Sequence, residues 1–359
     1  MYDIDFFKNT DSLKNKITKG FLNSSDCNNI DTELEVLRKK FPYIYNIETT
    51  NYCNMKCVMC PRTQFMTRKN IWIDDKLFEK IISDVKIHDQ KSLEYFWHWV
   101  ENDYNQKVTE VSENGFYFSV ISRHLVLHGF GEPFLDKKLI QRIASCTKKR
   151  IPTYFSCTPA TTTIEKVEKV MEAGLGVLKF SIDAMDEKKI KKIRGKKADF
   201  GDSVEKILKV IAIKKKKNLK TLLVPCMINL SAERDDAKMH REFLKFWSDK
   251  EVFAYIKCQD NRWLYENNKD LKSTSHYSKQ YCEFPWLSVS IMADGNVVPC
   301  TQIPNNEIVL GNINRNTLEE IWNGEKYQEL RRMHISGKFL KGHKCNEKCD
   351  MKKIYQYLS

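Results

Sequence analysis

Long apolar runs are missing from this 359-residue sequence, and no uncharged run is long enough to span a bilayer. The first residues, MYDIDFFKNTDSLKNK, contain early acidic side chains and no apolar core, so they do not form a secretory signal. Both absences predict a cytoplasmic protein, where thiols stay reduced. The twelve cysteines therefore indicate metal ligation or catalysis rather than a disulfide framework.

The basic segments lack interleaved aromatic residues. The formal net charge is +13, and lysine dominates the runs KKIKKIRGKK (188–197) and IKKKKNLK (213–220). Without aromatic side chains for base stacking, these runs predict solvated faces of surface helices rather than a nucleic-acid site. The charge leaves an anionic substrate or an acidic protein partner open.

Internal repeats and long linkers are also absent, and short β-branched or apolar runs alternate with amphipathic stretches. Strands are expected over 43–50, 124–134, 151–158, 176–184, 221–230 and 253–260. Helices are expected over 73–86, 135–149, 163–174, 200–217 and 235–247. This alternation predicts right-handed βαβ units and a parallel sheet. About six units are fewer than the eight of a closed barrel, so the α/β fold is a partial (β/α)6 TIM-like barrel with its site at the strand C-termini.

A loop after the first expected strand carries three cysteines without a fourth ligand nearby. The segment NYCNMKCVMCPRTQ (51–64) places Cys53, Cys57 and Cys60 in a C-x3-C-x2-C spacing. Structural zinc sites normally use four protein ligands, whereas catalytic ones use three and a water. Iron–sulfur clusters are usually held by four cysteines, so three would leave one iron open to an outside ligand. Zinc and a chance grouping are the alternatives.

This loop resembles the signature of radical S-adenosylmethionine (SAM) enzymes. The resemblance implies that Cys53, Cys57 and Cys60 hold a [4Fe-4S] cluster whose fourth iron is chelated by the amino and carboxylate groups of SAM. An electron from an external reductant, such as flavodoxin or ferredoxin, would then cleave SAM to methionine and a 5′-deoxyadenosyl radical. That radical would abstract a hydrogen atom from the substrate.

Further segments resemble the SAM-binding motifs of the family. GFGEP (129–133) is similar to its Gly-Gly-Glu-Pro motif, which implies that Gly129, Gly131 and Glu132 bind the SAM amino group. Met59 stands where many members carry an aromatic residue against the adenine, and a flexible thioether can pack there. The segments FSCTPATT, FSIDA and KIRG supply the remaining implied contacts to ribose and carboxylate: Ser156, Thr158, Ser181, Asp183 and Arg194.

A second cysteine set lies in the C-terminal third: Cys282, Cys300, Cys345 and Cys349. Asp294-Gly295 predicts a two-residue hairpin turn between the first two, and one helix over 316–333 is expected to return the chain to them. Four thiolates also suit zinc. The pattern resembles the SPASM/Twitch extension of radical SAM enzymes. Because four cysteines are present rather than seven, the resemblance implies one auxiliary [4Fe-4S] cluster.

Three domains are expected: a helical lead-in over 1–41, the barrel over 42–265 and an α+β auxiliary-cluster domain over 266–359. The lead-in should contain helices over 11–21 and 31–41. An aromatic-rich insertion over 87–121 is longer than a barrel connection needs, and it is expected to pack its own small core. The other cysteines are expected to be buried apolar residues: Cys27, Cys146, Cys157, Cys226 and Cys258.

The resemblance extends to dehydrogenase-like members that act on 2-deoxy-scyllo-inosamine. It implies oxidation of an alcohol in a sugar, cyclitol or nucleotide-sugar, with the auxiliary cluster accepting an electron. The segment YIKCQDNRW offers Lys257 or Asp260 as base and Arg262 as a substrate clamp. Cys258 would be the hydrogen donor if the reaction were an epimerisation.

Two other functions stay open. One is peptide modification by thioether formation or epimerisation, although the sequence shows no separate N-terminal winged-helix module. The other is a non-enzymatic iron–sulfur electron-transfer protein, which would not need a SAM pocket.

Overall fold

The computed structural model describes residues 1–13, 24–110, 112–230, 234–257 and 282–347. Within these ranges a nine-stranded sheet forms the centre, in the order β6-β5-β4-β3-β2-β1-β7-β8-β9. Neighbouring strands from β1 to β6 pair in parallel, and the sheet does not close. The predicted partial barrel is therefore confirmed. Its six strands are β1 (Ile44–Ile47), β2 (Leu125–Val126), β3 (Thr153–Cys157), β4 (Val177–Ser181), β5 (Leu222–Ile228) and β6 (Tyr255–Lys257).

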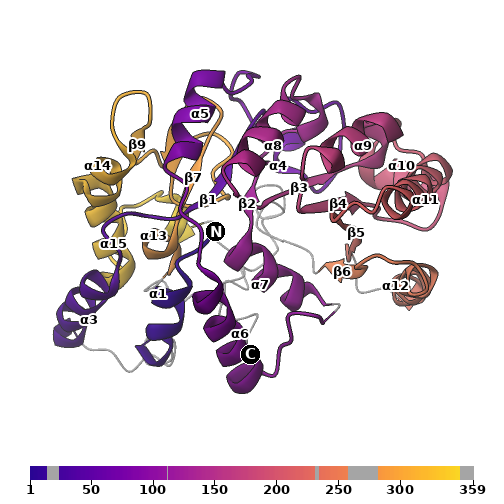
Figure 1. Ribbon diagram of the computed structural model, residues 1–359. Coiled ribbons are helices and arrows are strands. Elements are labelled where there is room, and N and C mark those ends of the chain that lie inside the picture. The colour runs from indigo at the N-terminus through magenta and orange to yellow at the C-terminus, as the bar shows by residue number, and fades with distance from the viewer. Residues whose placement is uncertain (14–23, 111, 231–233, 258–281, 348–359) are drawn as a thin grey trace.

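Amphipathic helices cover the outer side of this curved sheet (Figure 1). Each helix buries one apolar stripe, as α9 does with Val167, Val170 and Met171. Capping residues in the sequence mark where such a helix begins or ends. Thr163 caps the start of α9, and Gly174 follows its end with a φ of +97°. The outer helices are α5 (Asp75–Ser83), α8 (Leu139–Lys148), α9 (Ile164–Glu172), α10 (Glu187–Arg194), α11 (Phe200–Lys216) and α12 (Arg234–Trp247).

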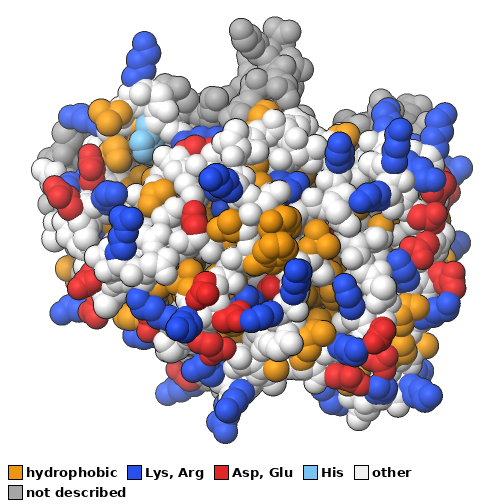
Figure 2. Space-filling view, turned by 90° about the horizontal axis from the view of Figure 1, so that it is seen from above, with side chains coloured by type: hydrophobic (Ala, Val, Ile, Leu, Met, Phe, Trp, Pro, Cys, Tyr) orange, Lys and Arg blue, Asp and Glu red, His pale blue; other side chains and the backbone are white. Residues whose placement is uncertain are grey.

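Most lysines of the two basic runs are exposed, on or directly beside α10 and α11, as predicted. Some pair with acidic side chains, as Lys191 does with Glu187 one turn away and Lys217 with Glu168 and Glu172 of α9. Figure 2 shows basic and acidic side chains interspersed over the face seen from above.

The C-terminal hairpin extends the barrel sheet. Strand β7 (Val289–Ile291) pairs in parallel with β1, and β8 (Asn296–Val298) returns antiparallel to it. The predicted hairpin is present, but its loop has three residues rather than two: the Met292 N–H donates to Asn296 O, and only Gly295, at a φ of +83°, adopts the left-handed conformation. Strand β9 (Gly311–Asn312) completes the sheet. The auxiliary segment is thus joined to the barrel by backbone hydrogen bonds.

The prediction of a single helix over 316–333 is wrong. Two helices stand there, α14 (Leu318–Asn323) and α15 (Glu325–Ser336), because Gly324 between them is extended with φ −72° and ψ 163°. The remaining short helices of the described chain are α4 (Pro61–Gln64), α13 (Phe284–Leu287) and α16 (Lys344–Glu347).

The aromatic insertion packs against the N-terminal segment. It forms α6 (Gln90–Tyr104) and α7 (Glu113–Arg123), next to α1 (Ile4–Asn9). Phe96, Trp97 and Phe118 are buried there with Phe7, so the insertion is packed as expected, but in a core shared with the N-terminal and C-terminal segments rather than one of its own. The helix expected over 31–41 is part of α3 (Ser24–Leu37), whereas the one over 11–21 falls mostly outside the described residues.

Helix α7 fills the concave side of the sheet at one end (Figure 1). It contacts both β2 and β6, which lie four positions apart in the strand order. Its Phe116 ring packs 5.5 Å from the ring of Tyr154 and 5.1 Å from that of Tyr255. Because these rings occupy the early parts of β3 and β6, the insertion closes the barrel near the strand N-termini. The strand C-termini are left for a site.

Candidate functional site

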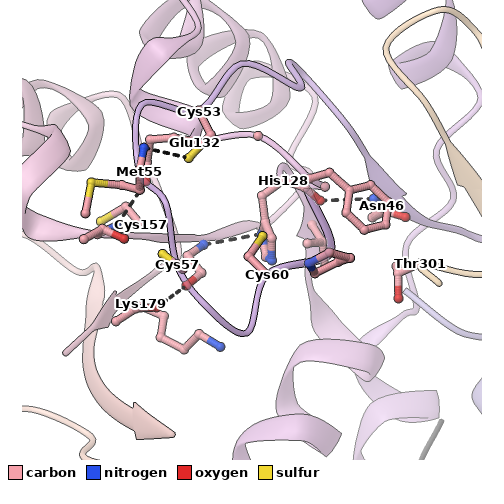
Figure 3. Close-up of a pocket in the computed structure, with 18 of the residues that line it drawn as sticks. Asn46, Cys53, Met55, Cys57, Cys60, His128, Glu132, Cys157, Lys179 and Thr301 are labelled. Carbon is pink, nitrogen blue, oxygen red and sulfur yellow. Dashed lines mark hydrogen bonds between the residues drawn. The ribbon is translucent and has the colours of Figure 1, made fainter. Parts of the chain in front are cut away.

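A cavity of about 390 Å³ lies at the C-terminal ends of the barrel strands. Cys53, Cys57 and Cys60 all line it from residues 51–64, named here the cysteine loop (Figure 3). Asn51 fixes the start of this loop, because its side chain donates to Lys69 O and accepts from the Ile71 N–H.

The three thiols of the loop form a donor set that fits an iron–sulfur cluster with one open iron. Burial raises the pKa of the Cys53 thiol to about 11, so this thiol is protonated at neutral pH until a metal displaces the proton. Among the described residues, no three Cys, His, Asp or Glu side chains are already gathered as metal ligands. The loop thus places its sulfur atoms along one wall of the cavity, but they are not already arranged as a metal site.

The GFGEP turn packs directly on the cysteine loop. The Glu132 N–H donates to Tyr52 O at 2.7 Å. A Cβ on Gly131 would lie 2.1 Å from Thr50 O, so only glycine allows this close approach. A Cβ on Gly129 would likewise lie 2.8 Å from Glu48 Cγ. Both glycines are therefore needed for packing, independently of any ligand.

Glu132 places a buried carboxylate at the cavity wall. It is 4% exposed and accepts the N–H groups of Thr158 at 3.1 Å and Phe134 at 3.3 Å. Burial raises the pKa of this carboxyl to about 7, although the two N–H groups oppose the shift. A carboxylate in this position can accept hydrogen bonds from an amino group, and such a cation would favour its ionised form.

Arg194 reaches the same wall from the end of α10. Its Nε donates to Asp183 Oδ2 at 2.5 Å, and its Nη1 lies 3.1 Å from Thr158 Oγ1 and 3.6 Å from Cys57 Sγ. Asp183 Oδ1 accepts the Ile228 N–H at 2.9 Å. Both Asp183 oxygens are therefore engaged, and Asp183 is not among the residues that line the cavity. The geometry makes Asp183 a positioning residue for Arg194.

The other residues carried over for SAM, Ser156, Ser181 and Met59, also line the cavity. Ser156 and Ser181 lie on neighbouring strands with their Oγ atoms 3.1 Å apart. The predicted SAM-contact residues thus come together at one place, with Asp183 behind them.

Lys179 and His128 line the cavity, and sequence reasoning missed both. Lys179 Nζ lies 5.8 Å from the ring centre of Phe116 and 6.0 Å from that of Tyr154, just above α7. Burial, and then the charge of Lys179, lowers the pKa of His128 to about 3, so this ring is neutral. A signal existed, because Val177, Lys179 and Ser181 alternate on one face of β4.

The auxiliary segment reaches the opposite side of the cavity. Met292, Thr301 and Gln302 line it, and Thr301 directly follows Cys300. Figure 3 shows Thr301 across the cavity from the cysteine loop.

Three members of the second cysteine set lie among the described residues. Cys282 and Cys300 pack against one apolar cluster, whereas Cys345 packs against the main barrel core. Cys349 lies outside the described residues.

Several other predicted residues are not brought into the cavity or cannot be placed. Lys257 ends β6 and is not among the described lining residues. Cys258, Asp260 and Arg262 lie outside the described residues, as does the side chain of Cys27. The predicted burial of the other cysteines is confirmed for Cys146, Cys157 and Cys226. Of these three, Cys157 also touches the cavity wall beside Glu132.

Comparison with known families decides the assignment. The model of the radical SAM superfamily matches residues 47–239, which is more than half of the chain. The chain belongs to the radical SAM superfamily. The SPASM model, an iron–sulfur cluster-binding domain, matches residues 282–350 of this radical SAM enzyme, and that segment contains all four C-terminal cysteines. No curated protein matches the sequence.

Solved structures are similar to this chain at low sequence identity. SuiB from Streptococcus suis, bound to its precursor peptide SuiA, is 13% identical over 84% of this chain and 69% of SuiB, with a TM-score of 0.51. BtrN in complex with AdoMet and 2-DOIA is 16% identical over 82% of this chain and 88% of BtrN, with a TM-score of 0.46. An anSMEcpe structure with bound AdoMet is 14% identical over 80% of this chain and 82% of anSMEcpe, with a TM-score of 0.48.

Family membership gives this radical SAM enzyme a [4Fe-4S] cluster, SAM and auxiliary iron–sulfur binding, and it requires a reductant and a substrate. In the described part of the chain, no helix combines the length and apolarity that a membrane crossing requires.

Proposed function

We propose that this enzyme oxidises an alcohol of a sugar, cyclitol or nucleotide-sugar by removing two electrons and two protons. One observation carries the proposal. The cavity lined by the cysteine loop is also lined by Thr301 and Gln302, next to the auxiliary cysteine Cys300. A substrate between these walls would have one iron–sulfur site on each side.

The cysteine loop side would begin the reaction. Cys53, Cys57 and Cys60 would hold the [4Fe-4S] cluster, while Glu132 would bind the amino group of SAM and Arg194 its carboxylate group. When bound, the cluster and SAM supply the radical that takes a hydrogen atom from the substrate carbon. Asp183 would hold the Arg194 guanidinium in place through its Oδ2, while the Ile228 N–H fixes its Oδ1.

Lys179 would bind the hydroxyl oxygen of the substrate. Its ammonium group lies in the cavity and makes no ion pair or hydrogen bond with any residue of the described ranges. A cation beside a hydroxyl favours the deprotonated oxygen, and an alkoxide-like radical is a stronger reductant than its protonated form. The neutral ring of His128 and the Ser156 and Ser181 hydroxyls supply further hydrogen-bonding groups.

The second electron would leave toward the auxiliary segment. Net oxidation would remove a hydrogen atom from the substrate carbon, a proton from its oxygen and one further electron, for which the auxiliary cluster, when bound by the C-terminal cysteines, would supply the acceptor; the product would be a ketone or an aldehyde. Lys257 and Asp260 stay the proposed proton acceptors, with Arg262 as clamp. Cys258 is not required for this outcome.

The test is product mass. The reconstituted enzyme is incubated anaerobically in deuterated water with SAM, a reductant and a panel of sugars, aminocyclitols, nucleotide-sugars and short peptides. A sugar-type product two mass units lighter supports the proposal, and Cys258→Ser should retain it. A product one unit heavier, with deuterium on carbon and dependence on Cys258, indicates epimerisation instead. Turnover of peptides alone indicates a peptide-modifying enzyme.

Lys179 gives a sharper variant of this test. We expect Lys179→Met to retain SAM cleavage without substrate but to lose most ketone formation. Lys206→Met, on the outer helix α11, is the matched control and should leave both unchanged, since it interrupts only the pair with Asp202 and a bond to Pro159 O.

A further inference from the structure

The cysteine loop has an exposed outer face ringed by lysines. Val58 is 49% exposed, and its N–H donates to Ile193 O at 2.9 Å. The Cβ position of Gly195 lies 3.4 Å from Lys56 Cβ, so the end of α10 packs directly on the loop. The surface formed by Lys56, Lys192, Lys196 and Lys197 around Val58 is named here the lysine patch.

The lysine patch carries charge that the fold does not neutralise. Its four lysines are exposed and form no ion pair or hydrogen bond with the described residues. Neighbouring lysines differ, since Lys191 pairs with Glu187 and Lys206 pairs with Asp202. Asp199 is the acidic side chain closest to the patch in the sequence, and its charge acts on Lys191.

The patch and the cavity are two sides of the same short loop. Met55 and Cys57 are buried and line the cavity, whereas Asn54, Lys56 and Val58 between and beside them are exposed. The exposed side chains of the loop are therefore direct sequence neighbours of the cysteines that would hold the cluster.

We propose that the lysine patch docks a small acidic electron-carrier protein that reduces the SAM-binding cluster. The reduced carrier would lose one electron, and the cluster held by the cysteine loop would gain it, with no atom transferred. Positive charge around the loop would steer a negatively charged carrier to the place where the cluster is nearest the surface. The proposal rests on the reductant requirement of the superfamily and is independent of the substrate oxidation.

The experiment compares two reductants on the reconstituted enzyme. Without substrate, 5′-deoxyadenosine formation is measured with reduced flavodoxin or ferredoxin and, separately, with dithionite. Reversing three charges, in Lys192→Glu, Lys196→Glu, Lys197→Glu, should slow the reaction driven by the carrier about tenfold or more and leave the dithionite reaction unchanged. The rate with wild-type enzyme should fall with rising salt, and this dependence should weaken in the variant.

A matched variant changes the same charge elsewhere. Lys148, Lys149 and Lys216 are exposed at the ends of α8 and α11, on the side of the strand N-termini. Their reversal to Glu should affect neither reductant. Surface plasmon resonance with the oxidised carrier gives a readout apart from activity, and only the patch variant should bind more weakly. Unchanged carrier affinity in the patch variant, or equal loss with carrier and dithionite, overturns the proposal.

Discussion

Glu48 and Arg68 form a buried ion pair with two hydrogen bonds at the end of β1. Arg68 Nη1 and Nη2 lie 2.8 and 2.7 Å from the two carboxylate oxygens, and the Glu48 side chain is fully buried. The same carboxylate accepts the N–H groups of Phe130 at 3.1 Å and Ala293 at 3.3 Å. One side chain thus ties the barrel, the GFGEP turn and the auxiliary hairpin together around the cavity.

Removal of Arg68 should destabilise the protein strongly. Arg68→Met leaves a buried carboxylate without its cation, which is expected to lower the free energy of unfolding by about 3–5 kcal/mol. Urea unfolding followed by circular dichroism measures this. Lys169→Met is the control, because it breaks only an exposed pair with Glu165 and should not move the midpoint. Equal midpoints for the two variants would show that the buried pair does not hold the hairpin.

Gly131→Ala should displace the cysteine loop. The new methyl group would lie 2.1 Å from Thr50 O, so backbone must move before the loop can hold a cluster. We expect most of the SAM-cluster iron and of the SAM cleavage to be lost. Gly201→Ala is the matched control, since its nearest neighbour would be 3.7 Å away, and it should behave as wild type. Normal iron content in Gly131→Ala argues against this packing.

Acid should destabilise the insertion through His88. Its ring is buried, lies 4.3 Å from the Tyr43 ring and contacts Tyr2 O at 2.7 Å through Nε2. Burial lowers the pKa of His88 from 6.5 to about 4. Above pH 6.5 the neutral His88 ring makes its full contribution to the free energy of unfolding. This contribution is lost as pH falls toward 4, because the unfolded chain takes up a proton on His88 at higher pH than the folded chain does.

Protonation of His88 should lower the free energy of unfolding by about 3 kcal/mol at low pH, since one pKa unit corresponds to about 1.4 kcal/mol. Urea unfolding between pH 7.5 and 4.5 measures it. His88→Asn should show a shallower pH dependence than wild type, and His98→Asn, on the exposed face of α6, should not. Identical slopes in all three proteins would rule out this role for His88.

Iron content should report two separate clusters. The reconstituted protein is expected to bind about eight irons, because each cluster contains four. Cys345→Ala with Cys349→Ala should lower this to about four and keep SAM cleavage. Cys53→Ala, Cys57→Ala and Cys60→Ala together should also leave about four irons but abolish 5′-deoxyadenosine formation. One zinc in place of the auxiliary iron would identify a structural zinc site instead.

The sequence was most informative where the signal is local. The cysteine loop and the Asp294-Gly295 turn each need only a few adjacent residues, and both lie where they were expected. Strand alternation along β4 is equally local, yet it does not say which face meets the cavity. Lys179 was therefore overlooked, because its position depends on the curvature of the whole sheet and on α7 beneath it.

Long-range packing explains the other differences. Aromatic content predicted that the insertion is a packed unit, but only the folded chain brings Phe116 between β3 and β6. The break at Gly324 had a local warning, since glycine inside a helix costs about 1 kcal/mol relative to alanine. The placement of Cys345 against the barrel core could not be read from spacing, because the turns at Gly337 and Gly342 do not say which element the chain meets after α15.

In the proposed reaction, one substrate lies between two iron–sulfur sites and loses an electron to each side of the cavity. The measurement is the ratio of oxidised product to 5′-deoxyadenosine in one anaerobic reaction of Cys282→Ala, Cys300→Ala enzyme with its substrate. We expect SAM cleavage to continue while the product two mass units lighter disappears. Formation of that product at the wild-type ratio without the auxiliary cluster would contradict the proposed reaction.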